Sequence, residues 1–237
     1  MDNYLKAFDF IDRVNQITEV DQLVAEFDQL LRNFGFIAFC VGNPIAPKLE
    51  LQERILVATW PEEWAKLWVD RNYVASDPVV YQLLQQPIPF RWRDVRKRAT
   101  GLGAEVMDSA RDFQFYDGLG IPVRSASREI MGITMAGPQI DLSERETACI
   151  HLAAIYFHAR LEHFKGIGAA TKVQLTVRER DCLSWAAAGK TDGETAQILG
   201  IGVQTAKQHM KNVMFKLDAI HRAQAVAIAI HKGLIAP

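Results

Sequence analysis

The sequence predicts an α+β protein in which an N-terminal α/β/α sandwich, built around a central antiparallel sheet, precedes a small all-α domain of four helices. Three observations lead to this prediction. Runs rich in β-branched and aromatic residues alternate with helical patterns in residues 1–165. A stretch of small residues then forms a linker, which we place at 166–172. Residues 173–237 contain only short helical patterns, each bounded by cap residues.

The elements of the first domain follow from local patterns. We expect helices where apolar residues recur at steps of three and four, in 3–33, 103–115 and 142–164. Pro61 opens a further helix, and so does Pro78 after Asp77, because the first turn of a helix does not need the N–H that proline lacks. We expect strands where β-branched and aromatic residues dominate, in 35–42, 54–60, 119–125 and 128–137, the last two as a hairpin around Ala126. The basic stretch 87–98 is expected to be a solvated loop or an irregular edge.

The helices of the second domain can be placed by their caps. Thr176 and Glu179 have the T-x-x-E spacing of a capping box, and Thr191 and Glu194 repeat it. The first helix stops at Gly189, where a left-handed backbone costs little. The other three helices are expected at 191–199, 203–217 and 222–232.

The third of these helices has two faces. Its apolar stripe recurs at steps of four and three residues and consists of Ala206, Met210, Val213 and Leu217. The opposite face carries long polar and basic side chains, namely Gln204, Lys207, Gln208 and Lys211. A short helix, a tight turn and a second helix with such a face form the helix-turn-helix pattern, whose second helix enters the major groove of DNA. A solvated face on an ordinary helical bundle is the alternative, but the capped helices on both sides of the turn favour DNA binding.

Composition and charge narrow the other possibilities. Residues 171–237 hold 9 Lys and Arg against 5 Asp and Glu, whereas the remainder holds 18 against 23, so the net charge of −1 hides an asymmetry. A positive second domain suits a surface that faces phosphates. The three cysteines are widely spaced, no apolar run spans a bilayer, and the N-terminal segment lacks the order of a signal peptide. We therefore expect a cytoplasmic protein that does not enter a membrane and needs no cofactor or metal.

Two other functional classes find little support in the sequence. No G-x-G-x-x-G, H-E-x-x-H or G-x-S-x-G motif occurs, so we do not expect an enzyme. A phosphate-accepting receiver domain needs acidic residues just after its first strand. Here the first expected strand runs into Gly42-Asn43-Pro44, which carries no carboxylate.

Large aromatic side chains gather in one short part of the first domain: Trp60, Trp64, Trp68, Tyr73 and Trp92. Small-molecule sites are mostly apolar and aromatic, with a few polar groups that fix the orientation of the ligand. Aromatic residues also dominate ordinary cores. Composition alone leaves the two interpretations open. Asp77 has two interpretations as well, because an aspartate before Pro78 is a good helix N-cap and a carboxylate is also a ligand acceptor.

The second domain resembles the DNA-binding domain of LuxR-type regulators. The resemblance covers the whole domain and is carried by Glu179, Leu183, Gly189, Thr191, Glu194, Ala196, Leu199, Thr205, Lys207, His209, Asn212, Lys216, Leu217, Arg222, Gln224, Ala225 and Val226. It departs from the family pattern at Gly202, Ala206 and His221, none of which is a basic contact residue. With the outward face of the third helix, it implies DNA contacts by Gln204, Thr205, Lys207, Gln208 and Lys211. We expect Lys207 to contact the DNA backbone and Lys211 to reach a base edge.

The first domain is similar to the autoinducer-binding domain of the same family. Trp64, Asp77, Pro78, Trp92 and Gly120 match positions that recur there, in order and spacing. The family's ligand is an N-acyl-homoserine lactone. The resemblance implies that the Trp92 indole donates to the lactone carbonyl, that Asp77 accepts from the ligand amide, and that Trp64 and Tyr73 wall the pocket.

Two residues depart from this family pattern. Trp68 stands where the family usually has a tyrosine whose hydroxyl bonds the ligand, and Trp60 also replaces a common tyrosine. The hydrogen bond that the tyrosine hydroxyl usually makes to the ligand must be replaced or lost. The larger indole also fills space that an acyl chain would use. Trp68 is therefore expected to shift the specificity toward another acyl length or a different signal that carries an amide.

The whole sequence thus indicates a ligand-responsive transcription regulator. The fourth helix of the second domain is small and apolar nearly all round, which predicts a dimer contact through Val226 and Ala229 on a palindromic operator, with the long helix at 142–164 as a second contact. RNA polymerase is a further candidate partner. A regulator that works without ligand or answers a non-lactone signal is the first alternative. A sensor whose helical domain only docks protein is the second, and salt-dependent binding to duplex DNA distinguishes it.

Overall fold

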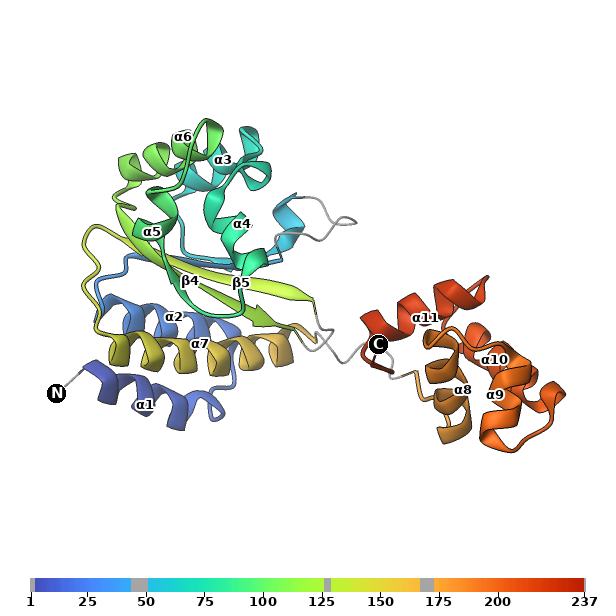
Figure 1. Cartoon of the computed structure of the whole chain (residues 1–237). Helices are drawn as coiled ribbons and strands as arrows, with labels where there is room; N and C mark the ends of the chain where they lie inside the picture. Colours follow the sequence, from blue (N-terminus) through green and yellow to red (C-terminus); the bar gives the residue numbers. More distant parts are fainter. Residues whose placement is uncertain (1–2, 44–50, 126–128, 167–172, 237) are drawn as a thin grey trace. The chain divides into compact units, whose positions relative to one another are not determined.

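The computed structural model describes residues 3–43, 51–125, 129–166 and 173–236 (Figure 1). These residues form two compact units, one before and one after the segment 167–172. The linker expected at 166–172 therefore lies outside the described residues except for Gly166, which ends a helix with a φ of 65°. The hairpin turn expected at Ala126 also lies outside them.

The first unit is built on one antiparallel sheet of five strands in the order β2-β1-β5-β4-β3. The strands are β1 (Ala38–Gly42), β2 (Ile55–Ala58), β3 (Phe90–Arg91), β4 (Asp117–Arg124) and β5 (Ile130–Gly137). The hairpin predicted from the sequence is confirmed, because β4 and β5 pair from Asp117–Gly137 through to Arg124–Ile130. The central position of β5 explains its apolar sequence, since both of its edges are paired and both faces are covered.

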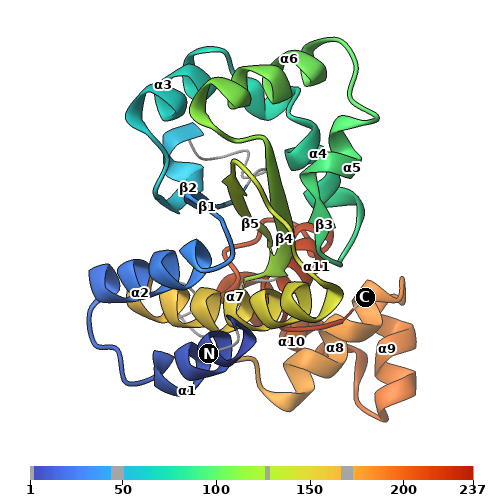
Figure 2. The ribbon, with the colours of Figure 1, turned by 90° about the vertical axis from the view of Figure 1, so that its left-hand side faces the viewer.

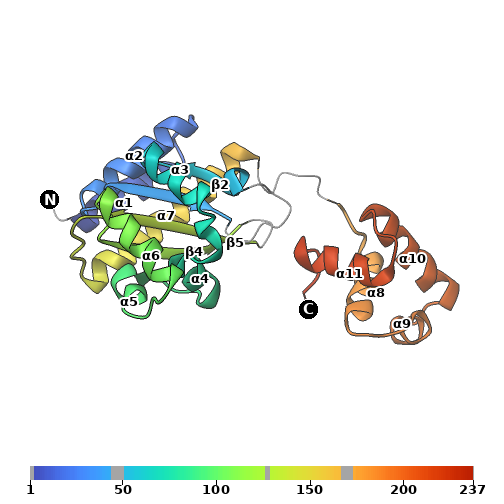
Figure 3. The same ribbon diagram turned by 90° about the horizontal axis from the view of Figure 1, so that it is seen from above.

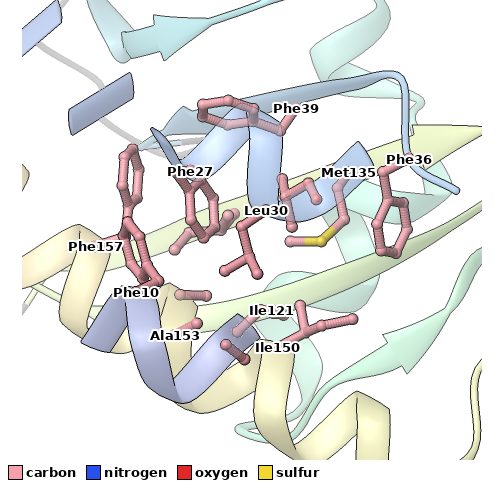
Figure 4. Close-up of a cluster of buried hydrophobic side chains, with 14 of the residues drawn as sticks. Phe10, Phe27, Leu30, Phe36, Phe39, Ile121, Met135, Ile150, Ala153 and Phe157 are labelled. Atoms are coloured by element: carbon pink, nitrogen blue, oxygen red, sulfur yellow. The ribbon is translucent and has the colours of Figure 1, made fainter. Parts of the chain in front are cut away.

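Two helices, α2 (Val20–Arg32) and α7 (Glu144–Lys165), lie on one face of this sheet, and α1 (Asn3–Val14) packs against both of them (Figures 1 and 2). Aromatic rings fill the space between them and the sheet (Figure 4). Phe27 of α2 stacks on Phe157 of α7 with ring centroids 4.0 Å apart, and the Phe39 ring meets both edge-on. Such contacts add to the burial of apolar area that fixes helices on a sheet.

The opposite face is covered by shorter helices (Figure 3). These are α3 (Glu62–Asp70), α4 (Pro78–Gln85), α5 (Trp92–Arg96) and α6 (Leu102–Ser109), joined by 3₁₀ turns η2 (Tyr73–Ala75) and η3 (Ala110–Phe113); a further turn, η1 (Leu51–Arg54), precedes β2. A second apolar core, rich in tryptophan, lies under these helices. The predicted α/β/α sandwich is therefore confirmed.

The expectation for residues 87–98 was correct for the sheet edge and wrong for the solvated loop. This segment forms the edge strand β3 and helix α5, and its arginines are anchored to other parts of the unit. Arg91 donates to the carbonyl of Leu142 at 2.7 Å, and Arg93 donates to the carboxylate of Asp117 at 2.7 Å. The sequence could not reveal this, because the partners lie more than twenty residues away along the chain.

Glycines in β4 allow the helices to approach the sheet closely. A Cβ atom on Gly118 would lie 2.7 Å from the ring of Trp92, and one on Gly120 would lie 2.3 Å from the ring of Phe90. Both distances are shorter than any real van der Waals contact, so these positions have room only for hydrogen. The two glycines therefore make room for the Phe90 ring of β3 and the Trp92 ring of α5 close to β4.

The second unit consists of four helices, α8 (Val177–Ala187), α9 (Asp192–Leu199), α10 (Val203–Lys216) and α11 (Arg222–His231). Both predicted capping boxes form, with Thr176 Oγ1 and Thr191 Oγ1 each accepting from the backbone N–H of the glutamate three residues later. Gly189 follows α8 with a φ of 80°. The positions of the helices, the caps and the left-handed stop thus agree with the sequence prediction.

Gly120→Ala should destabilise the first unit. The added methyl group must displace the buried Phe90 ring, and overpacking of this kind costs about 1–3 kcal/mol. Urea denaturation followed by tryptophan fluorescence measures the loss. Gly193→Ala is the control, because the nearest atom to its added Cβ is 3.9 Å away. Equal stability of Gly120→Ala and the parent protein would contradict the proposed contact.

Candidate ligand cavity and candidate nucleic-acid interface

A cavity of about 60 Å³ lies between the sheet and the helices that carry the tryptophans. Five of the seven residues predicted to bind a ligand line it, namely Trp60, Trp64, Trp68, Asp77 and Trp92. They come from α3 and the residue before its cap, from the cap of α4 and from the start of α5. The fold thus gathers residues that are up to 32 positions apart in the sequence around one space.

The tryptophans form a continuous wall. The Trp60 ring lies against Trp64 and Trp68, with centroids 6.3 Å and 5.6 Å away. Trp64 and Trp68 are one helical turn apart in α3, so their rings project to the same side. The aromatic cluster is therefore part of the second core and also lines a cavity, while ligand binding by these side chains stays a prediction.

Asp77 is the acidic group of this cavity. Its Oδ1 accepts from the backbone N–H of Val79 at 2.8 Å, which makes it the N-cap of α4. Its Oδ2 accepts from the indole Nε1 of Trp68 at 3.2 Å. Burial raises the pKa of Asp77, and the hydrogen bonds from Trp68 and the backbone act in the opposite direction. A carboxylate has about four acceptor sites, so these bonds leave capacity for another donor.

Trp92 supplies a donor without a partner. Its side chain is 8% exposed, and its Nε1 forms no hydrogen bond with any described residue. The backbone N–H of the next residue, Arg93, donates to Asp117 at 3.0 Å, which fixes the start of α5. Because buried N–H groups are nearly always paired, an unpaired donor beside a cavity calls for an explanation.

Tyr73 and Gly120 do not line the cavity. The Tyr73 ring packs behind Trp64, with centroids 6.2 Å apart, and its hydroxyl lies 3.2 Å from Ser109 Oγ. At Gly120 the Phe90 ring occupies the space next to the glycine, so the structure does not place Gly120 at the cavity. Both residues instead support the wall from outside.

The sheet contributes lining residues that the sequence analysis missed. Cys40 of β1 and Thr134 of β5 face the cavity and are direct neighbours across the two strands. Burial raises the pKa of the Cys40 thiol, and the nearby charge of Asp77 raises it further. The alternation of side chains along each strand identifies one face, but only the packed structure tells which face meets the tryptophans.

In the second unit, the five residues predicted to contact DNA share one exposed face of α10. Gln204, Thr205, Lys207, Gln208 and Lys211 are all exposed, whereas Ala206, Met210 and Val213 are buried against the other helices. Gln208 Nε2 donates to Asn212 Oδ1 at 2.9 Å along the same helix. The two faces of the helix are thus as predicted, and contact with DNA itself remains a prediction.

Other charged residues of the family pattern hold this unit together. Lys216 Nζ lies 2.6 Å from the carboxylate of Glu179, which is buried, and also donates to the carbonyl of Gln174. Arg222 pairs with Asp192, which joins α11 to α9. Lys216 and Arg222 are thus engaged in ion pairs away from the exposed face of α10. The charged groups of that face are Lys207 and Lys211.

One residue predicted for dimerisation is placed differently. Ala229 is 0% exposed and belongs to the core of its own unit, so it is not available to a partner. Val226 is half-buried, at the edge of the outer face of α11. The residues that share this face are apolar and follow helical spacing: Ala223, Val226, Ala227 and Ile230. Apolarity all round the helix could not reveal which side packs inward.

Other kinds of site are not evident in the described residues. No helix among them is long and apolar enough to cross a membrane. They also contain no group of three His, Cys, Asp or Glu side chains that could hold a metal ion.

Comparison with known proteins accounts for both units. Residues 19–161 match the autoinducer binding domain, and residues 173–229 match the luxR family of bacterial regulatory proteins. The chain therefore belongs to the LuxR family of quorum-sensing transcriptional regulators, which are not enzymes.

Relatives and solved structures agree along nearly the full length. The quorum sensing-dependent transcriptional regulator RpaR of Rhodopseudomonas palustris is 34% identical over 97% of this chain and 95% of its own. The transcriptional activator BjaR1 of Bradyrhizobium diazoefficiens is 30% identical over 98% of this chain and 97% of its own. The crystal structure of Escherichia coli SdiA has the same fold, with a TM-score of 0.73 at 19% identity over 100% of both chains.

Two lysines of α10 should affect different properties when replaced by alanine: Lys216 the stability of the second unit and Lys207 its binding to DNA. Lys216→Ala leaves the buried Glu179 carboxylate without its cation, which should cost about 2–3 kcal/mol in the second unit. Hydrogen exchange of the α8 and α10 amides reports on this unit separately. Lys207→Ala is the matched control on the same helix. It should leave stability within about 0.5 kcal/mol and reduce the salt dependence of DNA binding by roughly one charge. The assignment is wrong if Lys207→Ala keeps the parental salt slope or Lys216→Ala keeps the parental protection.

Proposed function

We propose that this regulator responds to an N-acyl-homoserine lactone and binds a palindromic operator as a homodimer. The observation that carries the ligand assignment is the combination of groups around one apolar cavity. Trp92 offers a buried donor with no partner, and Asp77 offers a buried acceptor with unused capacity. A ligand that has both a carbonyl and an amide N–H satisfies both groups.

The proposed pose follows from the chemistry of these two residues. An indole can only donate, so Trp92 binds the lactone carbonyl. The carboxylate of Asp77 accepts from the amide N–H, which is the stronger, charge-assisted kind of hydrogen bond. Trp60 and Trp64 cover the ligand from the side of α3. Each partner is already held by α4 or α5, so little ordering is needed when the ligand binds.

The size of the cavity points to a compact acyl group. A cavity of about 60 Å³ is small compared with the roughly 300–1,000 Å³ of typical ligand sites. The large rings of Trp68 and Trp60 take up part of the wall of this space. A short, branched or flat acyl group therefore requires less movement of the walls than a long straight chain. The alternatives are a non-lactone amide, which could use the same donor and acceptor, and a regulator that works without ligand.

The dimer assignment is supported by two apolar exposed faces. On α11 the exposed Ala223 and Ala227 are flanked by the half-buried Val226 and Ile230. On α7 an exposed stripe runs through Ala148, Leu152, Ile155, Tyr156 and Ala159. Both follow helical spacing, and self-association through such faces gives the two-fold symmetry that a palindromic operator requires. RNA polymerase is a candidate partner once the dimer is bound.

A ligand panel tests the first part of the proposal. We expect compact N-acyl-homoserine lactones to raise the melting temperature more than long-chain ones, because binding at a hundredfold excess over Kd adds about 2.7 kcal/mol to stability. Trp92→Phe removes the donor and leaves a smaller ring in the wall, so the gain in melting temperature that the ligand produces, relative to each protein's own value without ligand, should fall sharply. A panel with straight, branched and aromatic acyl groups that stabilises neither protein would refute the lactone assignment. Operator binding that needs no ligand would favour the ligand-independent alternative.

Ala227→Asp tests the dimer contact on α11. A carboxylate in the centre of the exposed apolar face should weaken both self-association and operator binding, because burying an unpaired charge is costly. Sedimentation of the full-length protein and electrophoretic mobility shifts measure the two effects. Ser184→Asp, which adds the same charge at an exposed position of α8, is the control and should keep both properties. A dimer that survives Ala227→Asp with unchanged operator affinity excludes this face.

A further inference from the structure

We infer that Trp68 is a positioning residue for Asp77, and that its indole N–H orients the carboxylate toward the ligand amide and does not itself bond the ligand. This inference rests on the proposed function for its ligand part only. Its structural part concerns two side chains of this protein and can be tested without any ligand.

The geometry assigns the only donor of Trp68 to Asp77. An indole has a single N–H, and that of Trp68 lies 3.2 Å from Asp77 Oδ2. The same carboxylate is fixed on its other oxygen by the Val79 N–H at 2.8 Å. Two donors on two different oxygens determine both the position and the rotation of the carboxylate plane.

The packing of Trp68 keeps this donor in place. Its side chain is buried, and the Trp60 ring covers it at a centroid distance of 5.6 Å. Trp68 is also one helical turn away from Trp64 in α3. The Trp64 ring in turn packs against the rings of Phe113 and Phe115. The indole therefore cannot swing toward a ligand without breaking the wall. A role in bulk alone would not require the Nε1 atom to face the carboxylate.

The bond between Trp68 and Asp77 limits the donors that a ligand can reach. Because the Trp68 donor is already used, it is not available to a ligand, whereas the buried indole N–H of Trp92 has no partner among the described residues. A second carbonyl of the ligand finds no donor at position 68. Recognition at Asp77 and Trp92 should therefore require one amide N–H and one carbonyl of the ligand.

The charge state of Asp77 provides the readout. Burial raises the pKa of Asp77, and the bond from Trp68 lowers it because a donor favours the charged form. Removing that donor should raise the pKa further. Cys40 and Arg54 are the other ionisable groups that line the cavity, and burial raises the pKa of the Cys40 thiol, which keeps it neutral from acidic to neutral pH. Ligand affinity should thus fall with decreasing pH, and this fall should begin at a higher pH without the Trp68 donor.

The first experiment follows the Asp77 carboxyl carbon by NMR in the full-length protein without ligand, with Asp77→Asn to assign the signal. Trp68→Phe should titrate at a higher pH than the parent. The matched control is Trp64→Phe, which removes an indole from the same wall but no bond to Asp77, and it should titrate like the parent. In the parent itself, the Trp68 indole N–H signal should shift together with the Asp77 titration, which keeps the test valid if Trp68→Phe folds poorly. Equal titration of the parent and Trp68→Phe, or a Trp68 signal that ignores Asp77, overturns the inference.

The second experiment measures binding of N-butanoyl-homoserine lactone and its N-methyl amide analogue by calorimetry across acidic to neutral pH. We expect Trp68→Phe to bind the first compound on the order of tenfold more weakly, with the pH dependence displaced upward. The N-methyl analogue, which lacks the amide N–H, should bind the parent weakly and be insensitive to Trp68→Phe. Equal affinities and pH profiles for the two proteins contradict the positioning role while the lactone assignment stands. Failure of the lactone to bind the parent, together with the expected NMR titrations, contradicts the lactone assignment alone.

Discussion

The buried carboxylate of Asp77 is the constraint on which the ligand side of the first unit depends. It starts α4 by accepting from Val79, and it ties α3 to α4 by accepting from Trp68. A buried carboxylate without such donors would be costly, so the helices that supply them are fixed relative to each other. The cavity is the space left when α3, α4 and α5 are held in this way over a sheet whose glycines allow close approach.

The DNA-binding unit uses the same physical rule for a different purpose. Glu179 is buried at the start of α8 and is satisfied by Thr176 and Lys216, so a cap and an ion pair together lock α8 onto α10. The pKa of Glu179 is lowered: burial opposes this, but the bond from Lys216 and those from Thr176 outweigh it. On α10, Lys216 therefore forms an ion pair within the unit, whereas Lys207 and Lys211 stay exposed. The exposed ones are then free to meet phosphates or bases, which is what a regulator of this family needs.

Local signals explain why much of this could be predicted. A capping box is complete within four residues, and the two faces of α10 follow from helical periodicity alone, so both agree with the structure. Where a role depends on distant partners, the sequence was less informative. The arginines of 87–98 are anchored by residues elsewhere in the chain, Ala229 turns inward although its helix is apolar all round, and Gly120 makes room for a ring from β3. The Trp68–Asp77 bond is of this second kind, since nine residues and a turn separate the two side chains.

The central claim is that one carbonyl of the signal satisfies the unpaired indole of Trp92 while its amide satisfies Asp77. The most direct measurement is the proton chemical shift of the Trp92 indole N–H in the full-length protein, labelled with ¹⁵N in tryptophan and titrated with the lactone that binds most tightly. A new hydrogen bond moves this proton downfield and slows its exchange with water, and the account predicts both changes at Trp92 with the Trp68 signal remaining protected throughout. A bound lactone that leaves the Trp92 signal unchanged, or one that exposes Trp68 to exchange, would contradict it.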